Sequence, residues 1–97
     1  MIIIRIAEVD GGAAVTVRGH SERAEKGKDI VCAAISALAN ALAKAAGWEQ
    51  AGIADDDGDV VYITSRSIGF KTVLKAVSAT MEEIAGQYPE DVKVVRS

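Results

Sequence analysis

The first twenty residues carry two runs in which apolar and polar positions alternate. Isoleucine recurs at every second position from Ile2 to Ile6, and valine recurs in the same way at Val15 and Val17. A period of two is typical of a strand with one buried face. Asp10-Gly11-Gly12, between the two runs, is a turn signal. The pattern therefore predicts a hairpin with strands over residues 2–9 and 13–19.

Two later segments have helical spacing, with apolar residues three and four positions apart. Asp29 is a preferred N-cap residue in front of the first segment, and Ser67 stands in front of the second. Gly47 and Pro89 are helix-ending residues. We therefore predict helices over residues 30–46 and from Ser67 to Tyr88. Their apolar stripes are Val31, Ile35, Leu38 and Leu42 in the first, and Phe70, Val73, Leu74, Val77, Met81, Ile84 and Tyr88 in the second.

Three shorter alternating segments predict further strands, at residues 48–54, 60–64 and 91–96. The acidic run Asp55–Asp59 predicts a hairpin turn, because its glycine position and the missing closing glutamate do not fit a calcium-binding loop. The element order is then ββαββαβ, within a single domain of residues 1–97. The simplest arrangement is a two-layer α+β sandwich, with both helices on one face of a largely antiparallel sheet.

One cysteine and one histidine in 97 residues limit the chemistry of this chain. A lone cysteine excludes an intrachain disulfide and a cysteine-rich zinc site, so we expect neither a metal nor another cofactor. The net charge of −3 argues against direct nucleic-acid binding, whose affinity comes mostly from lysine and arginine. Arg5 interrupts the apolar start, and no apolar run approaches the roughly 20 residues of a membrane span. We therefore expect a cytoplasmic protein without membrane contact.

His20 and Cys32 flank a polar segment, at the predicted end of a strand and in the predicted first turn of a helix. A thiolate is the reactive form of cysteine, and the unpaired N–H groups of a helix N-terminus favour its negative charge. Cys32 lies on the flank of the apolar stripe, in line with Ser36, rather than at its centre. We interpret the pair as a candidate base and nucleophile, with backbone N–H groups near Cys32 and Ala33 as a candidate oxyanion hole. The structural alternatives are a buried cysteine and a surface histidine.

Gly19-His20-Ser21 is followed, after a short polar segment, by Gly27-Lys28-Asp29-Ile30-Val31-Cys32-Ala33-Ala34-Ile35-Ser36. This pattern resembles the ribosomal-processing cysteine protease family (Prp), whose motif is Gly-His-Ala and then Gly-x-Asp-x-Val-Cys-Ala-x-x-Ser. The resemblance implies that His20 and Cys32 are the catalytic dyad of a single cysteine-protease domain. It also implies supporting or substrate-binding roles for Gly19, Ser21, Gly27, Asp29, Ala33 and Ser36.

Two departures from the family pattern bear on substrate preference. They are Ser21, where the family has alanine, and the charged run Glu22–Lys26. The resemblance implies that the enzyme removes a short N-terminal extension from the precursor of large-subunit ribosomal protein twenty-seven, through a thioester acyl-enzyme, and that it forms a homodimer. Two other hypotheses stay open at this point. One is a non-catalytic, dimeric protein-interaction module of the same fold, and the other is a redox-sensing thiol at Cys32.

Overall fold

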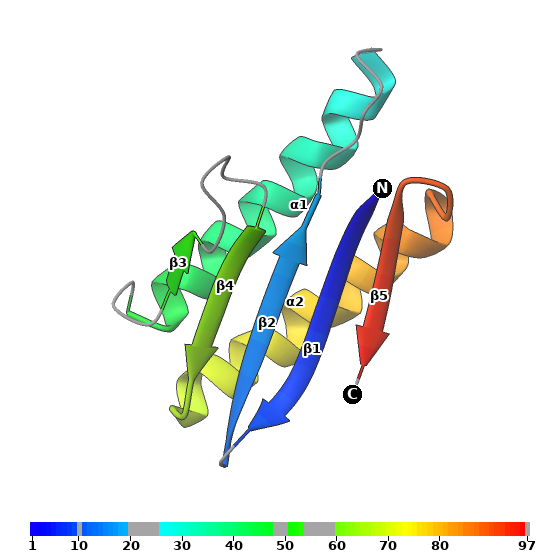
Figure 1. Ribbon diagram of the computed structural model, residues 1–97. Helices are drawn as coiled ribbons and strands as arrows, with labels where there is room; N and C mark the ends of the chain where they lie inside the picture. The colour runs from blue at the N-terminus through cyan, green and yellow to red at the C-terminus, as the bar shows by residue number, and fades with distance from the viewer. Residues whose placement is uncertain (10, 20–25, 48–50, 54–59, 97) are drawn as a thin grey trace.

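The computed structural model describes residues 1–9, 11–19, 26–47, 51–53 and 60–96 (Figure 1). These residues form helices and strands in the order ββαββαβ, as predicted. The helices are α1 (Lys26–Ala45) and α2 (Ile68–Gln87), and the strands are β1 (Ile2–Val9), β2 (Gly12–Arg18), β3 (Ala51–Ile53), β4 (Val60–Ser65) and β5 (Val92–Arg96).

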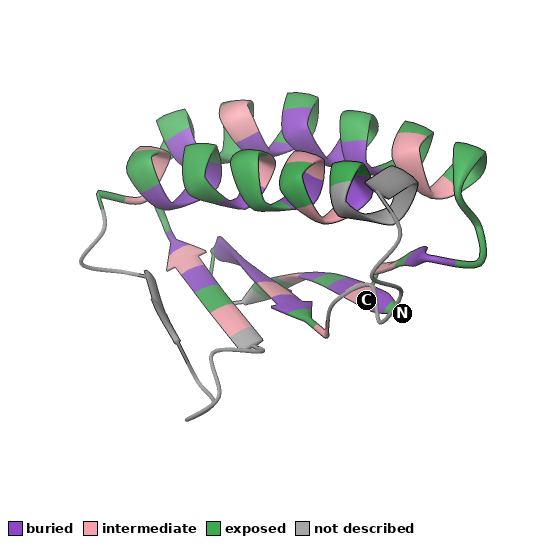
Figure 2. Ribbon diagram, turned by 90° about the horizontal axis from the view of Figure 1, so that it is seen from above, coloured by how far each residue is buried: buried purple, intermediate pink, exposed green. Residues whose placement is uncertain are grey.

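The five strands of the described part make one sheet, in the order β3-β4-β2-β1-β5 (Figure 1). β1 and β2 form the predicted hairpin, in which Ile4 lies opposite Val17. β4 pairs antiparallel with β2 and with β3, whereas β5 pairs parallel with β1. Both helices lie on one face of this sheet (Figure 2), so the predicted two-layer α+β sandwich is confirmed.

The core lies between the helices and the sheet, and the predicted periodicities mark its residues. Ile4, Val15 and Ile63 on neighbouring strands are fully buried, whereas Arg5 is exposed. The helix layer contributes Val31, Ile35 and Leu42 from α1, and Phe70, Leu74, Val77 and Met81 from α2. Burying one large apolar side chain contributes about 1.5–3 kcal/mol. This apolar interior therefore supplies most of the attraction between the two layers.

α2 begins and ends where the sequence predicts. The Ser67 Oγ accepts a hydrogen bond from the Phe70 N–H at 2.9 Å, so Ser67 is the N-cap. At the other end the Tyr88 N–H donates to the Ile84 carbonyl at 2.8 Å, and Pro89 follows. Proline lacks an N–H and cannot continue the helix.

α1 begins at Lys26, four residues before the predicted start at Ile30, so the prediction of Asp29 as N-cap is wrong. Gly27 lies inside the helix, where a glycine costs only about 1 kcal/mol relative to alanine. Packing of the helix against α2 and the sheet outweighs a cost of that size. Neither helix of the described part combines the length and the hydropathy that a membrane span needs.

The remaining strands agree with the prediction to within a few residues. β3 is Ala51–Ile53, inside the predicted strand over residues 48–54, of which residues 48–50 and 54 lie outside the described part. The predicted acidic turn Asp55–Asp59 also lies outside it. β4 and β5 lie within one residue of their predicted bounds.

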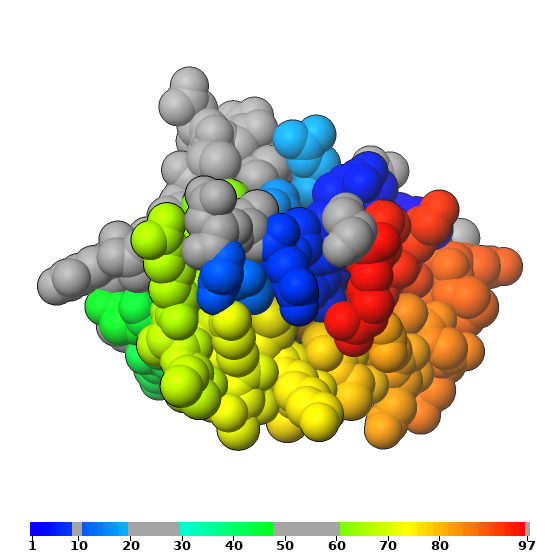
Figure 3. Space-filling view, turned by 90° about the horizontal axis from the view of Figure 1, so that it is seen from below, coloured from blue at the N-terminus to red at the C-terminus, as the bar shows by residue number. Residues whose placement is uncertain are grey.

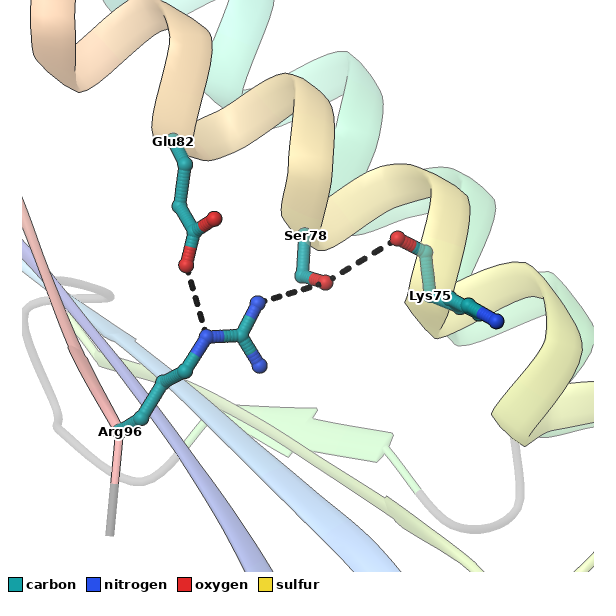
Figure 4. Close-up of polar contacts among 4 residues, drawn as sticks. All are labelled: Lys75, Ser78, Glu82 and Arg96. Atoms are coloured by element: carbon teal, nitrogen blue, oxygen red, sulfur yellow. Dashed lines mark hydrogen bonds and ion pairs between the residues drawn. The ribbon is translucent and has the colours of Figure 1, made fainter.

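A short polar chain fixes the end of β5 on α2 (Figure 4). The Arg96 Nε donates to the Glu82 Oε1 at 2.7 Å, and the Arg96 Nη2 donates to the Ser78 Oγ at 3.1 Å. The Ser78 Oγ in turn donates to the Lys75 carbonyl at 3.2 Å. The last strand is therefore held both by its ladder with β1 and by side chains of the helix layer.

Candidate active site

Cys32 lies on the flank of α1, at the border between core and surface. Val31 and Ile35 beside it are buried, whereas the Cys32 side chain is half-buried and packs against the edge of the core. Ser36 and Asn40, which follow along the same line of the helix, are exposed. The predicted position of Cys32 on the flank of the apolar stripe is thus confirmed. A cysteine placed there is supported by the core and is still partly open to solvent.

The early start of α1 changes the electrostatics predicted for this cysteine. Cys32 is the seventh residue of the helix, not a residue of its first turn. Only the first four N–H groups of a helix lack an intrahelical partner, and the favourable field for a negative charge falls off within the first turn. The predicted oxyanion hole at the N–H groups of Cys32 and Ala33 is therefore wrong for this structure, because both residues lie in the helix interior. The first-turn N–H groups belong to residues 26–29.

Gly19, which directly precedes His20, ends the described part of the chain after β2 in a conformation that favours glycine. Its φ is +86°, in the left-handed region that L-residues avoid. A Cβ at this position would collide with the Met1 carbonyl oxygen. The Ile2 N–H donates to the Asp91 carbonyl at 2.8 Å, so the Met1 backbone is held from the other side as well. The exit from β2 is thus tightly packed, and it sets the starting point of the segment that contains His20.

The other predicted site residues are divided between described and undescribed parts. His20 and Ser21 lie outside the described residues, as do residues 22–25 of the charged run. Gly27 and Asp29 lie in the first turn of α1, where only the backbone is described. Ala33 and Ser36 are exposed on α1, and both follow Cys32 along the helix. The structure therefore puts Cys32, Ala33 and Ser36 on one stretch of α1.

Asp91 contributes to the packing behind Gly19, although no signal in the sequence marks this role. Asp91 lies in the turn before β5 and is only 6% exposed, which is unusual for an aspartate. Its N–H donates to the Tyr88 carbonyl at 2.9 Å, and its carbonyl accepts from Ile2. The sequence predicts Asp91 only as the first residue of the last strand, with no signal that it is buried. Parallel pairing of β1 with β5 brings it to the start of β1.

A pocket of about 360 Å³ lies at the opposite end of the sheet from Gly19. It is lined by the end of β1, the start of β2, the first half of α2 and the end of β5. Figure 3 views the molecule from this end, with β1 in blue and β5 in red beside α2 in yellow. Lys71, Lys75 and Glu8 give its rim both signs of charge. Cys32 does not line it, so this pocket is not the site indicated by the motif.

Comparison with known proteins connects this geometry to a family. Residues 1–93 match the family described as cysteine protease Prp. The chain belongs to the cysteine protease Prp family. No curated protein matches the chain significantly. Family membership makes the chain a cysteine protease, which favours the predicted enzyme over the non-catalytic interaction module.

Solved structures of similar proteins have the same fold. The ribosomal processing protease Prp from S. aureus, in complex with a covalently linked product peptide, is 26% identical, with a TM-score of 0.79 and 100% of each chain covered. The same protease with a substrate peptide is 25% identical, with a TM-score of 0.76 and 100% of each chain covered. SMU.848 from Streptococcus mutans is 25% identical, with a TM-score of 0.80, covering 99% of this chain and 93% of that one. The predicted fold and the predicted family are both confirmed.

Proposed function

We propose that this Prp-family chain is a cysteine endopeptidase with Cys32 as nucleophile and His20 as general base. The observation that carries the proposal is the position of Cys32. It is the only cysteine of a chain in a cysteine protease family, and it lies half-buried on the flank of α1 instead of in the core. The only histidine directly follows Gly19, at the tightly packed exit from β2. Cys32 thus belongs to α1, and His20 comes in the sequence directly after Gly19, the last described residue behind β2.

The proposed reaction passes through a thioester. His20 takes the thiol proton of Cys32, and the thiolate attacks the carbonyl carbon of the scissile peptide bond. Collapse of the tetrahedral intermediate breaks the C–N bond, and His20 returns the proton to the leaving amine. His20 then takes a proton from water, whose oxygen attacks the thioester carbon. Collapse of this second intermediate breaks the C–S bond, protonated His20 returns its proton to the Cys32 sulfur, and the acid product leaves as a carboxylate after losing a proton to solvent.

Most of the activation of Cys32 falls to His20 in this proposal. A charge in the first turn of a helix gains about 0.3–1 kcal/mol from the macrodipole, and this gain decays beyond that turn. Cys32 lies beyond it, whereas a positioned general base contributes about 10²–10⁴ in rate. Changing His20 should therefore reduce the rate much more than any change of charge at the start of α1.

The proposed substrate is the precursor of large-subunit ribosomal protein twenty-seven, from which a short N-terminal extension is removed. This is supported by the S. aureus relatives, which are named as a ribosomal processing protease and are complexed with a substrate peptide or a covalently linked product peptide. We propose that Gly19, Ser21, Gly27, Asp29, Ala33 and Ser36 support the dyad or contact this peptide. A ribosomal precursor as substrate also favours the cytoplasm as the place of cleavage.

The test uses a peptide that spans the N-terminal junction of that ribosomal protein from the same organism. Mass spectrometry should show cleavage at one bond by the wild-type chain and none by Cys32→Ala. Asn40→Ala is the matched control, because Asn40 is exposed on the same line of α1, two turns further on. It should cleave like the wild type. Cleavage by a folded Cys32→Ala would contradict the proposed nucleophile, and cleavage of a scrambled peptide at equal rate would contradict the proposed substrate.

We also propose that the chain forms a homodimer, as the family resemblance implies. β5 pairs with β1 along one edge, and its other edge has no partner strand within the described residues. An edge of this kind presents backbone groups that a second copy can pair with. Light scattering should give twice the mass of the chain. A monomer mass across the concentration range would contradict this.

A further inference from the structure

The face of the sheet opposite the helices carries a row of exposed positive charge. The register places Arg18 of β2 opposite Ile3 of β1, and Ile3 opposite Lys93 of β5. Ile3 alternates with the buried Ile2 and Ile4, so this row lies on the face that the helices leave open (Figure 2). Both cationic side chains are exposed. Since neighbouring strands lie about 4.8 Å apart, their Cα atoms are roughly 10 Å apart.

The next row on the same face adds a third cation and an aromatic ring. Tyr62 of β4 lies opposite Thr16 of β2, and Thr16 lies opposite Arg5 of β1. Arg5 is exposed, and Tyr62 is 42% exposed. Tyr62 also lies opposite Gly52 of β3, a residue without a side chain. The register thus flanks Tyr62 with Thr16 and with a residue that has no side chain, and its exposure leaves the phenol ring accessible to a planar partner.

Negative charge is missing from this face among the residues that the structure describes. Glu8 is the acidic residue of β1. It follows Ala7, which lies on the open face, so Glu8 lies on the helix side, where it lines the pocket. Glu82 and Glu83 lie on α2. The described residues outside this face carry charges of both signs, such as Glu82 and Lys75 on α2, so within the described part the open face is where positive charge stands without acidic neighbours. Net charge alone predicted no nucleic-acid partner, because it does not describe this distribution.

We propose that the open face of the sheet, defined by Arg5, Arg18, Lys93, Thr16 and Tyr62, binds single-stranded nucleic acid. Such a site has two elements. Its cations follow the phosphate backbone, and an aromatic ring beside them stacks on a base. A second copy of the chain is disfavoured on this face, because face-to-face contact would bring like charges together. An acidic polypeptide would satisfy the cations but would leave Tyr62 without a planar partner. The proposal is independent of the proteolytic function, and Cys32→Ala should retain binding.

The expected salt dependence follows from the three cations. Each neutralised phosphate of a single strand contributes a slope of about −0.7 to the plot of log affinity against log salt concentration, so three give about −2. Arg18→Gln or Lys93→Gln should reduce the slope by about 0.7. Tyr62→Ala should weaken binding by about 5- to 150-fold with little change of slope, because stacking involves no counterion release. Tyr62→Phe should bind like the wild type.

The test is fluorescence anisotropy with labelled oligouridylate and oligothymidylate of roughly ten nucleotides, titrated at several salt concentrations. Lys44→Gln is the matched control, because Lys44 is an exposed cation on α1 in the helix layer. Tighter binding of oligouridylate assigns the site to RNA, and equal binding assigns it to single strands of either sugar. Absence of binding at low salt would overturn the proposal. Equal binding of polyglutamate, or losses in Lys44→Gln as large as those in Arg18→Gln, would also overturn it.

Discussion

Replacement of Gly19 by alanine tests the packing that sets the start of the His20 segment. Gly19 has a φ of +86°, and a Cβ there would collide with the Met1 carbonyl oxygen. Gly47, at the end of α1, has nearly the same φ of +85°, but a Cβ there would meet nothing within 4 Å. Comparison of Gly19→Ala with Gly47→Ala therefore separates the free-energy cost of the backbone conformation from that of the collision with Met1.

The expected loss in the free energy of unfolding differs between the two variants. An L-residue in the left-handed region costs about 1–2 kcal/mol, and the loss of glycine freedom in the unfolded chain returns about 0.4–1 kcal/mol. Gly47→Ala should therefore lower the free energy of unfolding by about 0–1.6 kcal/mol. Gly19→Ala must also displace the Met1 backbone, and overpacking of this kind costs about 1–3 kcal/mol more. Its total should be about 1–4.6 kcal/mol, which is about 1–3 kcal/mol more than the cost of Gly47→Ala.

The assay is equilibrium urea unfolding of both variants beside the wild type, followed by circular dichroism. Gly19→Ala should also cleave the precursor peptide more slowly at a temperature where it is fully folded, because the displaced backbone directly precedes His20. Gly47→Ala should cleave at the wild-type rate. Equal destabilisation by the two changes would refute the argument, since it would mean that the contact with Met1 adds no cost.

Three further changes test the rest of the fold by urea unfolding. Leu42→Ala should lower the free energy of unfolding by about 2–5 kcal/mol, because Leu42 is fully buried. Ile30→Ala on the same helix is the control and should lower it little, since Ile30 is 66% exposed. Equal losses would contradict the assigned faces of α1. Ser67→Ala should cost about 1 kcal/mol through loss of the α2 cap, and no loss would contradict the capping hydrogen bond. Glu82→Gln should cost less than about 1 kcal/mol, because the ion pair with Arg96 is about half exposed, and a larger loss would show that the pair is more strongly coupled than its exposure indicates.

Side-chain periodicity predicted the buried faces of the fold well. The alternation of Ile2, Ile4 and Ile6 reports directly which face of β1 is buried, because successive side chains of a strand point to opposite faces. The pairing of β1 with β5 could not be obtained in this way. It joins the two ends of the chain, and no local pattern encodes which strands become neighbours. The buried Asp91 and its contact with Ile2 follow from that pairing.

Local sequence patterns also predicted some parts of the candidate site and not others. The place of Cys32 beside the apolar stripe of α1 depends only on helical spacing, and it is confirmed. The start of α1 depends on a balance of small local terms, such as the capping preference of Asp29 and the flexibility of Gly27. These signals favoured a start at Ile30, whereas the helix begins at Lys26. The role of His20 stays a prediction, because its position depends on residues outside the described part.

The rate at which iodoacetamide alkylates Cys32 near neutral pH is the direct test of the proposed dyad. The folded chain should react faster than the same chain unfolded in urea, because His20 draws the proton from the thiol. His20→Gln should reduce the folded rate by roughly tenfold or more and leave the unfolded rate unchanged. A folded Cys32 that stays inert until the chain unfolds, or a rate that does not depend on His20, would contradict the proposed dyad.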